Sequence, residues 1–156
     1  MLGSVAFLTL LGLVRPARDL SGTIQDQEFA ATGAHVYQRV QNDERLTAGE
    51  RRVVRLQIYS GTERFPQQTV VLTMDIPKAK ELGNRELKVG VGDQTRFDGT
   101  IRQAVVVDGE GPKPLTLEKC RVELLKRQGD LLTFRIEAAG PAFQIKGKGK
   151  ATLEQI

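Results

Sequence analysis

Apolar and polar residues alternate with a period of two along most of the chain after residue 19. Residues 53–59, 69–76 and 132–138 show the pattern most clearly, and residues 87–91 repeat it over a shorter span. This period is typical of a β-strand with one buried face and one wet face. The three clearest strands place four large side chains on the inward face, and we expect them to be buried: Ile58, Leu72, Phe134 and Ile136.

Turn-forming residues separate these segments. Residues 127–130 (RQGD) and 139–141 (AGP) divide the end of the chain, so residues 115–154 are predicted to form a three-stranded antiparallel meander. Within it, residues 115–117 and 120–124 have opposite alternation, which indicates a bulge near residues 118–119. Residues 108–114 (DGEGPKP) are typical of a turn. At most one short helix is expected, near residues 77–83, with a proline in its first turn and a glycine at its end.

Short strands, frequent turns and almost no helix predict an all-β protein. The expected architecture is an antiparallel β-sandwich or a small β-barrel of about 8–9 strands. The chain has 156 residues, of which 40% are hydrophobic and 27% charged, and this size and composition suit one globular domain. We therefore expect residues 19–156 to form a single β domain.

The N-terminal segment has a different character. Residues 2–14 carry no charge, and thirteen residues are too few to span a bilayer as a helix, so no stable transmembrane span is expected. Their length fits the apolar region of a secretory signal, although no basic residue precedes them and no clean cleavage site follows. Residues 1–18 are thus predicted to be a secretory signal or a truncated one, which favours a periplasmic or secreted protein. The alternative is a buried first element of a cytoplasmic protein.

Composition excludes several classes of site. A single cysteine excludes an internal disulfide, and a single histidine excludes any site that needs two imidazoles. The chain lacks tryptophan and has few other aromatics, which argues against stacking on nucleic-acid bases. The net charge of +4 comes from residues 113–156, which hold nine basic and five acidic side chains. Such an excess favours contact with an anionic surface.

Candidate catalytic and metal-binding residues each have a simpler structural explanation. Cys120 and His35 are the only thiol and imidazole, but no local motif surrounds either, and Cys120 falls on the inward set of its strand. Asp93 and Asp98 lie in a glycine-containing loop and are weak calcium candidates, as are Asp108 and Glu110. Turn chemistry is the interpretation that the sequence favours for both loops, and no cofactor is predicted.

The least ordinary segment is residues 143–153, where Lys146, Lys148 and Lys150 share one face. We call these three residues the lysine strip. Lysines of this kind commonly protect a solvated or edge strand from pairing with another chain, which is the interpretation that the sequence favours. Alternatively, three ammonium groups spaced about 6.6–7 Å apart along a strand would form a binding strip for an anionic surface.

These features favour an exported, non-enzymatic domain that acts by surface contact, as a binding or structural accessory of the bacterial envelope. Its partner would be another protein or an anionic envelope surface, and the domain could also form a homo-oligomer. A second hypothesis is a β-barrel carrier of a small apolar ligand, with room left by the small inward residues Ala138, Gly147, Gly149 and Ala151. A third is an enzyme with a carboxylate site formed by loops.

Overall fold

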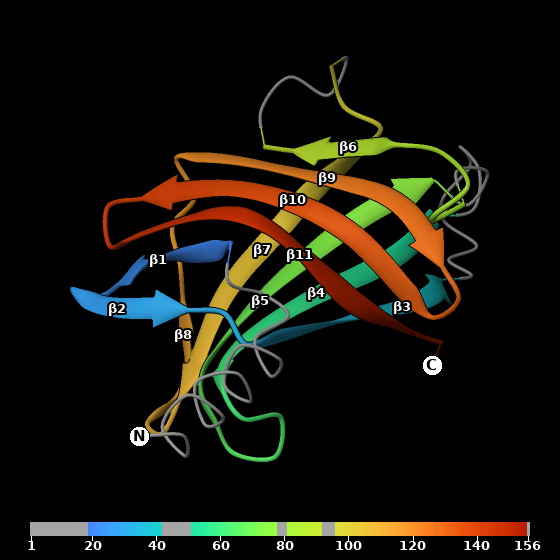
Figure 1. Ribbon diagram of the computed structural model, residues 1–156. Helices are drawn as coiled ribbons and strands as arrows, with labels where there is room; N and C mark the ends of the chain where they lie inside the picture. The colour runs from blue at the N-terminus through green and yellow to red at the C-terminus, as the bar shows by residue number, and fades with distance from the viewer. Residues whose placement is uncertain (1–18, 42–50, 78–80, 92–95, 156) are drawn as a thin grey trace, which may run out of the picture.

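The computed structural model describes residues 19–41, 51–77, 81–91 and 96–155. The predicted signal, residues 1–18, lies outside the described residues. Figure 1 shows a strongly curved β-sheet that folds back on itself. Its strands are β1 (Leu20–Ile24), β2 (Gln27–Ala30), β3 (Gly33–Gln41), β4 (Arg51–Gly61), β5 (Pro66–Pro77), β6 (Leu87–Gly90), β7 (Gly99–Asp108), β8 (Gly111–Pro114), β9 (Lys119–Gln128), β10 (Leu131–Gly140) and β11 (Phe143–Gln155).

Eight of these strands form a closed barrel. Around the ring they follow the order β10, β9, β6, β7, β5, β4, β3 and β11, and β10 then pairs with β11 to close it. The all-β prediction is therefore confirmed, and the small barrel is the alternative that the chain adopts. The predicted C-terminal meander is also confirmed, since β9, β10 and β11 pair antiparallel in sequence order.

Two pairs of neighbouring strands in the ring are parallel, in contrast to the predicted antiparallel arrangement. β11 runs parallel to β3, and β6 runs parallel to β7. The β11–β3 contact brings together strands from the two ends of the domain and completes the barrel wall. The β6–β7 contact involves only two residue pairs, because just the last two residues of β6 lie beside the start of β7. Strand alternation alone carries no information about either pairing, since it does not say which strands become neighbours.

Three short strands lie outside the ring. β1 and β2 form a hairpin through Gln25 and Asp26, both with positive φ as a tight turn of this kind requires, and β1 also pairs with β11. β8 pairs with β7 where the sequence indicated only a turn. Pro112 and Pro114 are compatible with β8 because an edge strand does not need every N–H group for pairing.

The barrel interior is filled by apolar side chains. Ile58, Leu72, Phe134 and Ile136 are all buried, which confirms the predicted inward face of the three clearest strands. The Phe134 ring lies against Gly149 of the neighbouring strand, where a side chain would approach it closely. The second face of each strand therefore forms the outer surface of the barrel.

Two local predictions differ from the structure. In the range 77–83, Pro77 ends β5 and Leu82 forms a bridge to Arg85, so the described residues there are not helical, while residues 78–80 lie outside the description. The bulge lies in β9 at residues 125–126, where the register against β10 shifts, rather than near residues 118–119. Residues 115–118 precede β9 instead of belonging to it. No helix in the described residues is long and apolar enough to cross a membrane.

Candidate functional site

The lysine strip lies on β11, near the middle of the sheet. All three lysines are exposed, and they alternate with Ile145, Gly147, Gly149 and Ala151, which point the other way. β11 pairs with β10 along one side, and along the other with β1 at residues 143–147 and with β3 at residues 152–155. On the side of β1 and β3 the ladder pairs end at Gly147 and resume at Thr152, so Lys148 and Lys150 lie beside a stretch of β11 that is paired on one side alone, whereas Lys146 is paired on both sides.

Arginine and lysine side chains pair with Glu123 and Glu137, two of the carboxylates on the outer surface of the meander. Glu123 lies 2.8 Å from Arg121 and 3.1 Å from Arg135, and its side chain is only 11% exposed. Glu137 lies 3.5 Å from Lys119. Glu137 also lies opposite Lys146 in the ladder between β10 and β11, whereas Lys148 and Lys150 lie opposite Arg135 and Thr133. Within the described residues, Lys126 and the three strip lysines form no ion pair.

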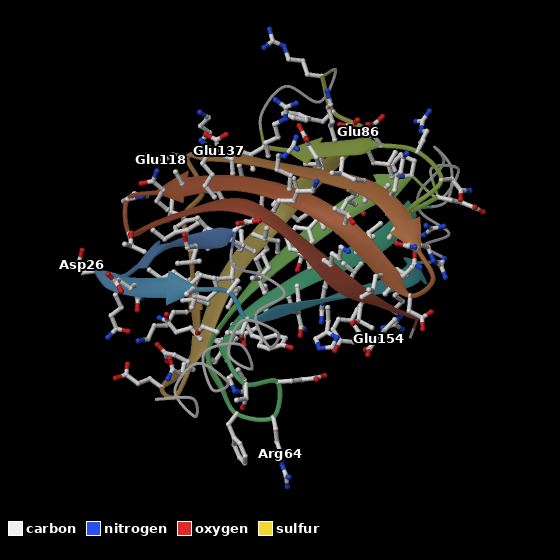
Figure 2. All side chains as sticks on the ribbon, in the orientation of Figure 1. Asp26, Arg64, Glu86, Glu118, Glu137 and Glu154 are labelled. Atoms are coloured by element: carbon white, nitrogen blue, oxygen red, sulfur yellow. The ribbon has the colours of Figure 1, made fainter. Side chains whose placement is uncertain are left out.

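On the outer surface of β9, β10 and β11 the cations outnumber the carboxylates, and we call this surface the basic face. Figure 2 places Glu137 near one end of the meander and Glu154 near the opposite end of β11, and the strip runs between these two positions. The charge excess of residues 113–156 is thus gathered on one side of the barrel. The exposed cations of the basic face are Lys119, Arg121, Lys126, Arg135, Lys146, Lys148 and Lys150.

A bulge in β9 shapes part of this face. Leu132 pairs with Arg127 and Phe134 pairs with Leu124, so Leu125 and Lys126 together face the single residue Thr133. The extra residue lies beside an open depression of about 400 Å³ on the outer surface. We call it the bulge depression, and it is lined by Asn84, Arg85, Glu86, Leu125, Lys126, Thr133 and Lys148.

The calcium candidates have structural partners. Asp98 accepts a hydrogen bond from the backbone N–H of Lys88 at 2.9 Å and lies 3.6 Å from Arg85, while Asp93 is outside the described residues. Asp108 and Glu110 both contact the ammonium group of Lys113, at 3.4 and 2.6 Å. Among the described residues, no cluster of three or more acidic, histidine or cysteine side chains is arranged to hold a metal ion.

The barrel wall separates Cys120 from His35. Cys120 points into the interior from β9 and is 4% exposed, whereas His35 alternates with the buried residues Ala34 and Val36 and lies on the outer surface of β3. The structure therefore does not bring together the only thiol and imidazole of the chain, and a Cys–His nucleophile cannot form between them.

His35 is less accessible than a surface imidazole, because its side chain is only 14% exposed. It stacks on Tyr59 with ring centroids 5.8 Å apart, and its Nε2 lies 3.1 Å from a carboxylate oxygen of Glu63. A carboxylate oxygen of Glu154 lies on the other side of the ring, 3.8 Å from Nδ1 of His35. Burial raises the pKa of the neighbouring Tyr37, and the negative charge of Glu154 raises it further. These side chains link β11, β3 and β4 beside the parallel pairing of β11 with β3. We therefore interpret the cluster as structural.

Cys120 should react slowly with thiol reagents in the native protein. Burial raises the pKa of its thiol from 9.0 to about 12. Because only the thiolate is a strong nucleophile, we expect labelling at pH 8 to be roughly 10²–10³-fold slower than in the urea-unfolded chain. Stopped-time alkylation followed by mass spectrometry measures both rates. Native labelling at the unfolded rate would place the thiol in contact with solvent.

The same pKa difference predicts a loss of stability at alkaline pH. The native state retains a proton that the unfolded state releases, so the contribution is fully present below about pH 9 and is lost as pH rises toward about 12. Cys120→Ala lacks this contribution, and its free energy of unfolding should fall less between pH 9 and 11 than that of the wild type. Burial also raises the pKa of Tyr37 and Tyr59, but both chains share these residues.

Arg85 and Lys126 are the site residues that the sequence did not predict. Arg85 comes from the segment before β6 and meets the meander only in the folded barrel. Lys126 follows Leu124 and Leu125, two successive apolar residues that interrupt the alternation of β9. This interruption was the available indication of a bulge. No family model, curated protein or solved structure matches the chain.

Proposed function

We propose that this protein is a non-enzymatic binding domain that contacts an anionic partner surface through the basic face. The observation that carries the proposal is the position of the lysine strip. Its three ammonium groups lie exposed on one face of β11 and form no ion pair among the described residues. Lys146 lies where both sides of β11 are paired and no edge needs protection, and three ammonium groups on one face would attract an anionic surface. Export to the bacterial envelope, where such surfaces occur, is part of the same proposal.

The carrier hypothesis receives less support. The small residues that would leave room for an apolar ligand are approached by other parts of the chain. The Phe134 ring occupies the space beside Gly149, and the backbone of β1 lies against Gly147. The loop-enzyme hypothesis is also weaker, because Asp98, Asp108 and Glu110 already have cationic partners. Contact through the outer surface is the function that these observations favour.

Replacing Lys146, Lys148 and Lys150 together with glutamine should weaken binding to a model polyanion. With dextran sulfate as the probe, we expect the Kd to rise about tenfold, because each exposed ion pair contributes only a few tenths to one kcal/mol. Wild-type binding should also weaken steeply with salt, since exposed charges are screened beyond about 10 Å at 0.1 M. Isothermal titration calorimetry at two salt concentrations measures both effects.

A matched control separates position from net charge. Arg39, Arg55 and Arg64 are exposed on β3, β4 and the β4–β5 loop, and their replacement by glutamine removes the same total charge. Figure 2 shows Arg64 on the loop that projects from the end of the barrel. We expect this control variant to bind within about twofold of the wild type. If both triple variants lost the same affinity for dextran sulfate, net charge alone would explain the binding. That result would contradict a localised binding face.

A further inference from the structure

The bulge depression differs from the rest of the basic face in being concave. One wall comes from residues 84–86, which precede β6, and the other comes from the outer surface of the meander. The bulge places Leu125 and Lys126 opposite Thr133, at the junction of these two walls. The remaining strip lysines, Lys146 and Lys150, continue along β11 on either side of Lys148. The depression is thus a recess within a longer cationic track.

The lining combines positive charge and polar groups with the apolar side chain of Leu125. Arg85, Lys126 and Lys148 supply three cations from three different elements, against the single carboxylate of Glu86. The hydroxyl of Thr133 adds an uncharged hydrogen-bonding group, while the side-chain amide of Asn84 already donates to Glu81 at 2.8 Å. Asp98 lies 3.6 Å from Arg85, which restrains the guanidinium near the edge of the recess. Converging cations and hydroxyl donors are the groups that bind phosphate, sulfate and carboxylate.

We infer that the bulge depression binds one oxyanion group of an acidic polysaccharide, with the neighbouring units of the chain lying along the lysine strip. This inference rests on the proposed function and names its ligand class. The volume of about 400 Å³ is at the lower end of the range for small-ligand sites, which suits one substituted sugar unit. Lys146 and Lys150 then contact anionic groups on the adjoining units at a spacing set by the strand.

Shape and composition favour a polysaccharide over a bilayer or a nucleic acid. A flat bilayer surface cannot fill a concave recess, and the large exposed hydrophobic residues of the described chain, which could enter lipid, do not line it. Those residues are Phe65, Val91, Val107 and Leu131. The lining also has no aromatic side chain on which a base could stack. A branched or substituted polar chain offers protruding charged groups that can enter the recess.

Variants of the full chain test this subsite with dextran sulfate as the ligand and neutral dextran of equal length as its control. Lys126→Gln should raise the Kd about fivefold, and Lys146→Gln, which removes the same charge outside the depression, about twofold. Thr133→Val keeps the charge and the branched shape of the side chain but removes the hydroxyl. We expect it to raise the Kd about threefold to tenfold, since a hydrogen bond to an anion is stronger than a neutral one. Arg39→Gln should bind as the wild type does.

The outcomes separate the subsite from the proposed function. Equal effects of Lys126→Gln and Lys146→Gln, with no effect of Thr133→Val, would overturn the subsite while leaving the basic face intact. Wild-type protein that binds dextran sulfate no better than neutral dextran would overturn both. If the protein bound vesicles with acidic lipid more tightly than dextran sulfate at equal anion concentration, the partner would be a membrane surface. That result would overturn the assignment of a polysaccharide. Circular dichroism of each variant confirms that the chain remains folded.

Discussion

Phe134→Ala is expected to lower the free energy of unfolding by about 3–5 kcal/mol, through lost burial and the cavity left behind. The Phe134 side chain is 0% exposed, lies at the centre of β10 and fills the space beside Gly149. Neighbouring strands are hydrogen-bonded on both sides of β10, so the wall cannot easily collapse into the vacated volume. Urea unfolding followed by circular dichroism measures the loss.

Leu131→Ala provides the control on the same strand. Leu131 is 43% exposed, and its truncation should cost less than about 1 kcal/mol. A loss of that small size for Phe134→Ala would mean that the ring is not held in a packed interior. Such a result would also reopen the carrier hypothesis, because an interior that tolerates the missing ring has room for a ligand.

Gly147→Ala should lower the free energy of unfolding by about 2–4 kcal/mol, of which backbone strain accounts for about 1–3 kcal/mol. The φ angle of Gly147 is 149°, a backbone conformation that residues other than glycine rarely adopt. An added Cβ would also overlap the carbonyl oxygen of Asp19 and the backbone of Leu20. β1 would have to move away, exposing the buried side chains of Ile24 and Phe29. Thermal and urea unfolding measure the effect.

Gly109→Ala is the matched control for this prediction. Gly109 has no positive φ, and an added Cβ would meet no atom within 4 Å. Its substitution should change the free energy of unfolding by less than about 0.5 kcal/mol. If Gly147→Ala were equally harmless, β1 would not pack closely on β11 as the register between Leu20 and Gly147 requires.

Residues with a regular alternation gave reliable predictions because burial acts on every second residue of a strand. Ile58, Leu72, Phe134 and Ile136 were predicted to point inward on this basis and do so. The turns at residues 127–130 and 139–141 were equally clear, since glycine adopts the positive φ angles that tight turns need and proline fixes its own φ. These local signals determine strands and hairpins, and they were sufficient to predict the meander.

Closure of the barrel could not be predicted, because it depends on contacts between distant segments. Nothing in the alternation of β3 or β11 indicates that they become parallel neighbours. β8 was missed because Pro112 and Pro114 normally argue against a strand, and only the exposed edge of β7 accommodates them. The bulge was assigned to the wrong end of β9 because the register of β10 against it fixes the position.

The candidate site was predicted in part. Lys146, Lys148 and Lys150 share a face because their spacing on a strand is two residues, and the sequence is sufficient to show this. The recess beside Lys148 is different, since Arg85 reaches it from a segment more than forty residues earlier in the chain. Lys126 joins the recess because the bulge alters the direction of β9. The depth of the depression and the convergence of its cations arise only when the chain is folded. A single sequence therefore does not predict them.

Residue-resolved NMR of the full chain titrated with dextran sulfate at low salt tests the central claim most directly. If the basic face is the binding surface, the largest amide shift changes should fall at residues 146–150 and at Lys126 and Thr133, and they should reverse on addition of salt. Shift changes concentrated around Arg39, Arg55 and the β4–β5 loop, with none on β11, would contradict it.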